Sequence, residues 1–168
     1  IVRWTVSGAR DIERLEYLVQ RLGDNSMFDG EQAEFLVNTA ALKGKDWLGA
    51  MTSLNHIQTA AILDECRAEL ERRFHAFYAA QSRENHDRIH LMVNTLQHHL
   101  DQKRCALNER IQNCQLANNE RQRRIIPALQ GQLNKLQQKI ELKIKELQLK
   151  ESVTAHDNMV SGGVIRVI

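Results

Sequence analysis

Apolar residues in the second half of the chain recur at intervals of three, four and seven, the spacing of a coiled-coil seam. They form two series whose residue numbers add up to 236 in every pair, as facing positions do in an antiparallel hairpin. The pairs are Ile89 with Leu147, Leu96 with Ile140, Leu100 with Leu136, Leu107 with Leu129, and Ile111 with Ile125. One pair departs from the pattern, because Lys103 faces Leu133; its stem can pack on the leucine while its amine points outward.

The two series predict an antiparallel coiled-coil arm over residues 86–151. Its apex falls at the pair Asn118-Asn119, and asparagine suits a turn because it tolerates left-handed backbone angles. Pro127 lies inside the returning half and has two interpretations. It either kinks the helix by removing one backbone hydrogen bond, or it opens a new helix, where proline suits the first position. The constant sum favours the kinked hairpin.

Residues 50–126 contain neither glycine nor proline. Such a run predicts either one very long helix or several helices joined by tight polar turns. Its first part carries a second apolar face, which we expect to pack with the N-terminal helices.

The N-terminal part alternates between strand-like and helix-like patterns. Residues 1–6 alternate and are rich in β-branched side chains, which predicts a strand. The segment Asp11–Leu22 places its apolar residues on one helix face, and Gly23 stops it. Asp29 with Gln32 resembles a capping box for a helix near Glu31–Leu42. Trp47 is expected to pack under the glycine-containing turn that follows.

The C-terminal part is predicted as a polar loop over residues 152–163 and a second strand over residues 164–168, which can pair with the first. The fold class is therefore mainly α: a small helical platform over 1–85 with short N- and C-terminal strands, and a long antiparallel coiled-coil hairpin. The 152–168 segment returns to the platform.

The start of the chain, its hydropathy and its cysteines indicate the cellular environment of the protein. The chain opens at Ile1, inside an apparent strand, and we expect it to be a piece of a longer protein. Neither a secretory signal nor an apolar run long enough for a membrane span is visible. Three cysteines without a CxxC spacing indicate reduced thiols rather than disulfides or a zinc ribbon. A cytoplasmic protein is expected.

Positive charge is concentrated in the predicted arm. Residues 101–150 carry 11 Lys/Arg and 5 Asp/Glu, a net +6, whereas the whole chain has a net charge of +2. Clustered cations attract phosphate backbones without reading sequence. The candidate nucleic-acid-binding residues flank the tip: Lys103, Arg104, Arg110, Arg121, Arg123 and Arg124. The alternatives are that these cations only keep a coiled coil in solution, or that they meet a protein with an acidic face.

Catalytic patterns are weak. The chain lacks the GxxxxGK[ST] phosphate loop, so this piece should neither bind nor hydrolyse ATP. His86 and His90 share a helix face as in the HExxH zinc motif, but Asp87 replaces the glutamate and no third ligand is evident. His98 and His99 lie about two turns further along, too far for the same ion. We expect no catalytic residue, no metal and no cofactor in this piece.

Several stretches are similar to the C-terminal region of bacterial Swi/Snf-type superfamily 2 helicase-like ATPases, which are related to RapA proteins and include members of anti-phage defence systems. The stretches are Cys66–Phe74, Glu84–Arg88, His99–Arg104, Gln130–Leu136 and Gly162–Val167. The resemblance implies a DNA-translocating ATPase whose ATP and Mg²⁺ bind in motor domains outside this piece. It also implies a C-terminal arm that contacts double-stranded DNA, a partner protein or the motor itself.

Three functions compete. The first is a non-catalytic accessory module of such an ATPase, with a basic arm that contacts nucleic acid or regulates the motor. The second is a protein-interaction or dimerisation coiled coil without nucleic-acid contact. The third is an RNA-binding arm, similar in shape to the helical hairpin of seryl-tRNA synthetases.

Overall fold

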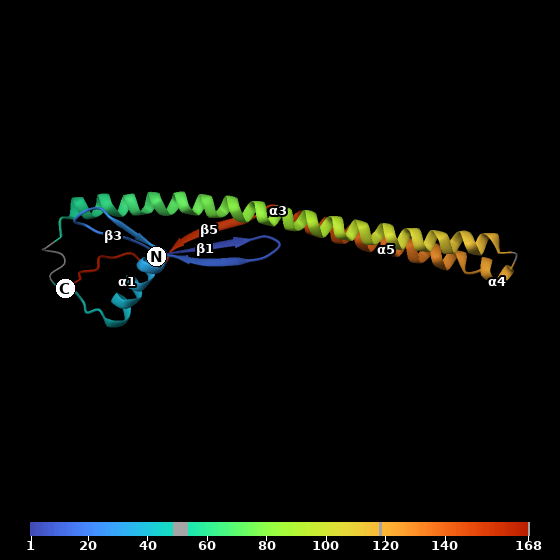
Figure 1. The fold of residues 1–168 in the computed structure, drawn as a ribbon, viewed down its shortest axis with the longest axis horizontal. Helices are drawn as coiled ribbons and strands as arrows, with labels where there is room; N and C mark the ends of the chain where they lie inside the picture. Colours follow the sequence, from blue (N-terminus) through green and yellow to red (C-terminus); the bar gives the residue numbers. More distant parts are fainter. Residues whose placement is uncertain (49–53, 118, 168) are drawn as a thin grey trace. The chain divides into compact units, whose positions relative to one another are not determined.

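The computed structural model describes residues 1–48, 54–117 and 119–167, and it is mainly α with short strands from both ends of the chain (Figure 1). The chain divides into two compact units. We call residues 1–7, 11–81 and 154–168 the platform unit, and residues 8–10 and 82–153 the arm unit. The long helix α3 (His56–Leu116) contributes its first part to the platform unit and its second part to the arm unit.

The platform unit contains a three-stranded antiparallel sheet with the order β2-β1-β5. Its central strand β1 (Val2–Ser7) confirms the predicted N-terminal strand and lies between β2 (Ile12–Glu16) and β5 (Thr154–Met159). The alternation of β1 buries Val2, Trp4 and Val6 on one face. Trp4 is the centre of this core, with its ring 5.8 Å from Phe74 and 5.4 Å from Phe77 of α3.

A second, two-stranded sheet pairs β3 (Leu18–Gln20) with β4 (Met27–Asp29), and α1 (Gly30–Lys43) follows. Gly30 has a positive φ of 52°, which explains a glycine where the strand turns into the helix. The predicted helix near Glu31–Leu42 is confirmed as α1. Asp29 is its N-cap residue but makes no capping hydrogen bond; its carboxylate accepts one from Arg73 at 3.1 Å instead.

The helix predicted over Asp11–Leu22 is wrong, because this segment forms β2 and β3. Its buried position is Glu16, which pairs with Arg14 at 2.9 Å and with Arg73 at 3.4 Å. A search for apolar residues cannot identify a buried carboxylate whose charge is balanced by two arginines. Leu15, which the helical interpretation placed inside, is exposed on β2.

The C-terminal strand is six residues long but lies at Thr154–Met159, inside the segment predicted as a loop. Residues 164–167 form no strand, and Val167 is largely exposed. The predicted strand over residues 164–168 is therefore wrong, and the strand that pairs with β1 is β5 instead. Trp47, expected to pack near a turn, is half-buried, and the Arg166 guanidinium lies 5.2 Å from its ring centre.

The arm unit is an antiparallel pair formed by the second part of α3 and by α5 (Ile126–Leu149). Most of the run without glycine or proline is one helix of 61 residues, His56–Leu116, and the described residues after it include the separate short helix α4 (Glu120–Arg123). The buried apolar residues of the two helices within the arm unit are seam positions predicted from the apolar pattern: Ile89, Ile111, Leu129, Ile140 and Leu147. Ile125, predicted to face Ile111, is instead 44% exposed, because it precedes the first turn of α5. Lys103 is exposed, as expected for the one charged seam position.

The hairpin register continues beyond the pair of Ile89 and Leu147, on the side away from the tip. The Asn85 side-chain amide donates to the carbonyl oxygens of Lys150 and Glu151 at 2.9 Å and 3.0 Å. Positions 85 and 151 obey the same constant sum of 236. The Asn85 carbonyl oxygen accepts from the backbone N–H of Ala9 at 2.8 Å, so one side chain joins three segments of the arm unit.

The kinked-hairpin interpretation of Pro127 is wrong. A short helix α4 (Glu120–Arg123) follows α3, and α5 begins at Ile126, so Pro127 lies in its first turn. Proline is tolerated there because the first N–H groups of a helix need no intrahelical partner. Asn119 caps α4 by accepting from the backbone N–H of Arg121 at 3.0 Å; Asn118, the other predicted turn residue, lies outside the described residues.

None of the described helices carries an apolar stretch long enough to cross a bilayer.

Candidate functional site

Six cations predicted to bind nucleic acid lie on three consecutive segments of the arm unit, and every one is exposed. Lys103, Arg104 and Arg110 belong to α3, Arg121 and Arg123 to α4, and Arg124 directly follows α4. Within the described part of the chain, Arg124 alone among these six has an ion pair, a long one of 4.0 Å to Glu120.

The local structure concentrates three of these charges at the tip. Asn119 starts a single helical turn, and α5 starts again at Ile126, so Arg121, Arg123 and Arg124 crowd within four residues. In the part of the chain that the structure describes, Arg121 and Arg123 have no ion pair, and Arg124 has only the long one to Glu120. Unpaired, exposed guanidinium groups are suited to bind phosphate because each presents several donors in a fork.

Lysines extend the positive charge down α5. Lys135, Lys139 and Lys145 are exposed and unpaired within residues 1–48, 54–117 and 119–167. Lys143 instead pairs with Glu146 at 2.8 Å, and this hydrogen bond lowers the pKa of the Glu146 carboxyl. The arm unit as a whole carries 14 Lys/Arg against 8 Asp/Glu, a net +6.

The arm unit contains no Phe, Tyr or Trp. Single-stranded nucleic acids bind largely by stacking their bases on aromatic side chains. The arm therefore offers a surface for phosphate groups rather than for unstacked bases.

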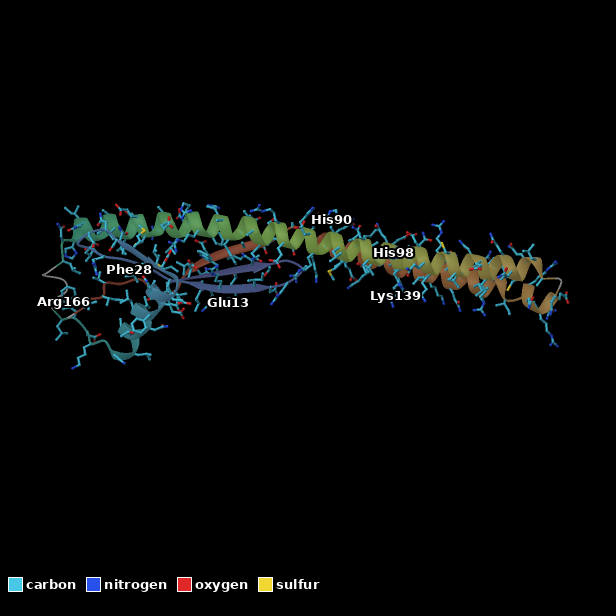
Figure 2. The ribbon with its side chains drawn as sticks, in the orientation of Figure 1. Glu13, Phe28, His90, His98, Lys139 and Arg166 are labelled. Carbon is cyan, nitrogen blue, oxygen red and sulfur yellow. The ribbon has the colours of Figure 1, made fainter. Side chains whose placement is uncertain are left out.

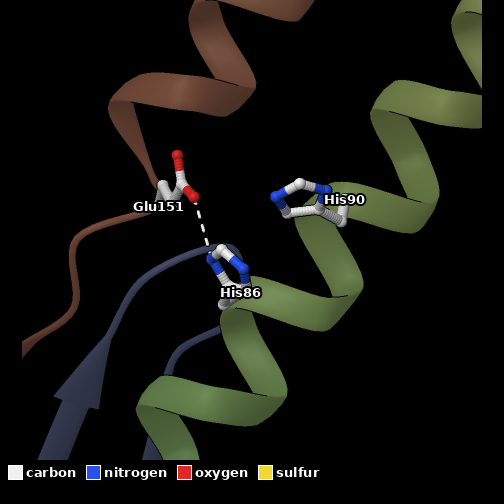
Figure 3. A group of neighbouring side chains, drawn as sticks. All are labelled: His86, His90 and Glu151. Atoms are coloured by element: carbon white, nitrogen blue, oxygen red, sulfur yellow. Dashed lines mark ion pairs between the residues drawn. The ribbon is translucent and has the colours of Figure 1, made fainter.

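A second group of chemically capable side chains lies at the opposite end of the arm unit from the tip, where α5 ends (Figure 3). His86 Nδ1 lies 2.9 Å from a carboxylate oxygen of Glu151, and the rings of His86 and His90 have centres 4.4 Å apart. One nitrogen or oxygen from each of the three side chains lies within 4.8 Å of those of the other two. Figure 3 shows His90 turning a ring nitrogen toward the carboxylate.

An open hollow of about 330 Å³ adjoins this group and is lined by Ser82, Arg83, His86, Asp87 and Glu151. Figure 2 labels His90 and His98 along α3. The hollow thus combines two carboxylates, one guanidinium and one imidazole at the surface of the arm unit.

Sequence reasoning named His86 and His90 but missed Glu151 as their neighbour. The signal was present in the register, since position 151 faces position 85 and must therefore lie beside position 86. It was overlooked because the seam pairs considered were apolar.

Two other side chains of α3, Glu69 and Cys66, have shifted pKa values. Glu69 accepts hydrogen bonds from Arg72 and Arg73 at 2.7–2.8 Å, which lowers the pKa of its carboxyl from 4.5 to about 2. Such a carboxylate stays ionised and does not act as a proton donor at neutral pH. Burial raises the pKa of the Cys66 thiol, with nearby Glu65 adding to the shift, so its reactive thiolate form is disfavoured.

No protein-family model, no curated protein and no solved structure matches the chain.

Proposed function

We propose that the chain is a non-catalytic accessory module whose basic coiled-coil arm binds the phosphate backbone of double-stranded DNA in the cytoplasm. The observation that supports this function best is the set of exposed arginines at the tip of the arm unit, of which Arg121 and Arg123 have no ion-pair partner among the described residues. Unlike Lys143, which pairs with Glu146 at 2.8 Å, Arg121 and Arg123 keep their N–H donors available for phosphate oxygens.

The chain is further proposed to belong to a Swi/Snf-type helicase-like ATPase, with ATP and Mg²⁺ bound in motor domains elsewhere in that protein. This step rests on the resemblance of the sequence segments described above. In such a protein, an arm that binds the duplex backbone without reading its sequence would increase the affinity for DNA at every site along which the motor moves.

Fluorescence anisotropy with a labelled duplex across a salt series tests DNA binding. Each cation that neutralises a phosphate contributes about 0.9 to the slope of log affinity against log salt. Binding should therefore weaken steeply with salt, and replacing Arg121, Arg123 and Arg124 by Glu should remove most of it.

The matched control changes the same amount of charge on the platform unit, in Lys43→Glu, Lys45→Glu and Arg67→Glu. These three cations are also exposed. Equal losses in both triple variants would show that only net charge matters and would reject the tip as the binding surface. Tighter binding to folded RNA than to duplex DNA would replace DNA by RNA as the ligand.

A second candidate function is protein–protein interaction through the outer face of α5. Leu142 and Leu149 are 63% and 82% exposed and lie seven residues apart, so they share one helix face that the seam does not cover. A partner helix would bury them. Sedimentation of the protein across a range of concentrations tests self-association, which Leu142→Ser with Leu149→Ser should abolish.

A further inference from the structure

We propose that His86, His90 and Glu151 form a binding site for one divalent transition-metal ion, with Zn²⁺ as the best fit. The inference is independent of DNA binding, because it uses none of the cations at the tip. It rests on the identity of the three side chains, on their distances and on the contacts that hold them in place.

The donor set suits such an ion. Two imidazoles and one carboxylate are common ligands of Zn²⁺, which binds nitrogen at about 2.0–2.1 Å and carboxylate oxygen at about 2.0–2.2 Å. Donor atoms that all lie within 4.8 Å of one another need only small side-chain rotations to reach one ion. His86 and Glu151 have side chains that are 53% and 41% exposed, so neighbouring residues leave room for those rotations.

The spacing of the histidines is set by helix geometry. His86 and His90 are four residues apart on α3, so their side chains leave the helix on the same face, one above the other. Among the described residues His90 makes no hydrogen bond or ion pair, and its ring lies at an angle of 51° to the ring of His86. It therefore has no competing interaction to give up on binding a metal ion.

The third ligand comes from the other helix of the arm unit and is held there by the backbone. Asn85 precedes His86 and binds the carbonyl oxygen of Glu151 itself, at 3.0 Å. This hydrogen bond fixes the main chain of Glu151 next to the histidines independently of any ion. A preformed site of this kind loses less conformational freedom on binding than one assembled from mobile chains.

The ion would replace the direct contact between His86 and Glu151, with its remaining coordination positions filled by water. Asp87 and Ser82 line the adjoining hollow and are placed to accept or donate hydrogen bonds to those waters, while Arg83 limits the negative charge there. Since the ligands come from both helices, a bound ion would cross-link α3 to the end of α5.

Co²⁺ titration of the tag-free, EDTA-treated protein, followed by visible absorption, tests the site. We expect one Co²⁺ per chain, visible bands of a nitrogen- and oxygen-coordinated ion, and displacement by Zn²⁺. Zn²⁺ should also raise the thermal unfolding temperature of the protein, because it binds only the folded form with these ligands.

His86→Ala, His90→Ala and Glu151→Gln should each weaken Co²⁺ binding about tenfold or more, since even outer-sphere changes alter metal affinity by about 10–100-fold. His99→Ala is the matched control, because His99 is an exposed histidine of the same helix outside the group. Circular dichroism before metal addition should be the same for all four variants and the wild type.

Three results would overturn the proposal. The first is no Co²⁺ binding at a protein concentration of about 100 μM, which lies above the dissociation constants of about 0.1–10 μM of protein calcium sensors. The second is an equal loss of affinity in His99→Ala. The third is a sulfur-to-cobalt charge-transfer band, which would assign the ion to the cysteines.

Discussion

In the platform unit Arg73 binds carboxylates from three elements, whereas in the arm unit Arg121 and Arg123 have no ion-pair partner among the described residues. The partners of Arg73 are Glu69 of α3, Glu16 of β2 and Asp29 at the end of β4. The platform unit has 9 Lys/Arg against 13 Asp/Glu, and the arm unit has 14 against 8. The same residue type therefore joins short elements in one unit and remains free for an external ligand in the other.

The two units also bury different side chains. The platform unit packs the aromatic rings of Trp4, Phe74 and Phe77 together, and the arm unit buries a single row of Ile and Leu. A cluster of aromatic rings concentrates stability at one place, whereas a seam distributes it along a line. Substitutions should therefore differ in effect between the two units, and the predictions below test this difference.

The largest effect is expected at Trp4, which is 2% exposed. Trp4→Ala should lower the free energy of unfolding by about 3–5 kcal/mol, because it opens a cavity at the centre of the platform unit. Chemical denaturation followed by circular dichroism measures the change. Leu42→Ala, at a side chain that is 84% exposed, is the control and should be nearly neutral. Similar losses in both variants would contradict the assigned core.

The arm unit offers a matched pair on one helix, Leu147 and Leu149, which are 6% and 82% exposed. Leu147→Ala should destabilise the protein by about 2–4 kcal/mol, since it removes a buried seam side chain. Leu149→Ala should change stability by less than about 0.5 kcal/mol, as most surface substitutions do. Thermal and urea unfolding of the two variants compare them directly, and the reverse order would reject the register of the hairpin.

Arginine substitutions test the contrast between paired and unpaired charge. Arg73→Ala should destabilise the protein by about 1–3 kcal/mol, because the buried carboxylate of Glu16 loses one of its two partners. Arg123→Ala should leave stability unchanged and weaken DNA binding instead. The same urea titration gives both stabilities. A destabilised Arg123→Ala would show that the tip cations hold the fold.

The smallest expected effect concerns pH. Because the pKa of Glu69 is lowered from 4.5 to about 2, its pairs with Arg72 and Arg73 stabilise the folded state above pH 4.5. This contribution is lost as the pH falls toward 2, where the carboxylate becomes protonated in the folded state too. Melting temperatures across this range should fall less steeply for Glu69→Gln than for the wild type. Glu71→Gln, at an exposed position of the same helix, should retain the wild-type slope.

The seam of the arm was predictable because its apolar residues repeat over many turns, so one register satisfies all of them. The short strands of the platform unit were harder to predict from the sequence. Ile12 and Leu15 fit a helix face, but β2 buries Glu16 instead, and its pairs with Arg14 and with the distant Arg73 make that burial favourable. The strand β5 has a polar sequence, and its pairing with β1 decides its structure, a contact that local pattern cannot reveal.

The candidate sites divide in the same way. Charge along the sequence located the basic tip, because consecutive arginines remain neighbours in any fold. The group of His86, His90 and Glu151 needed the pairing of two helices, which only the register supplies. The position of Pro127 was misjudged because the constant sum does not distinguish a kink from a new helix start when both keep the helices antiparallel.

The hairpin register has a consequence for how the chain acquires its structure. Facing residues near the tip, such as Leu107 and Leu129, are separated by a short loop, whereas Asn85 and Glu151 are 66 residues apart. Loop closure becomes less favourable with length. We therefore expect the hairpin to form first at the tip and then to extend along both helices toward Asn85 and Glu151. The three-stranded sheet should form last, because Thr5 of β1 and His156 of β5 are 151 residues apart in the sequence. During synthesis, the sheet β2-β1-β5 cannot be completed until β5 has left the ribosome.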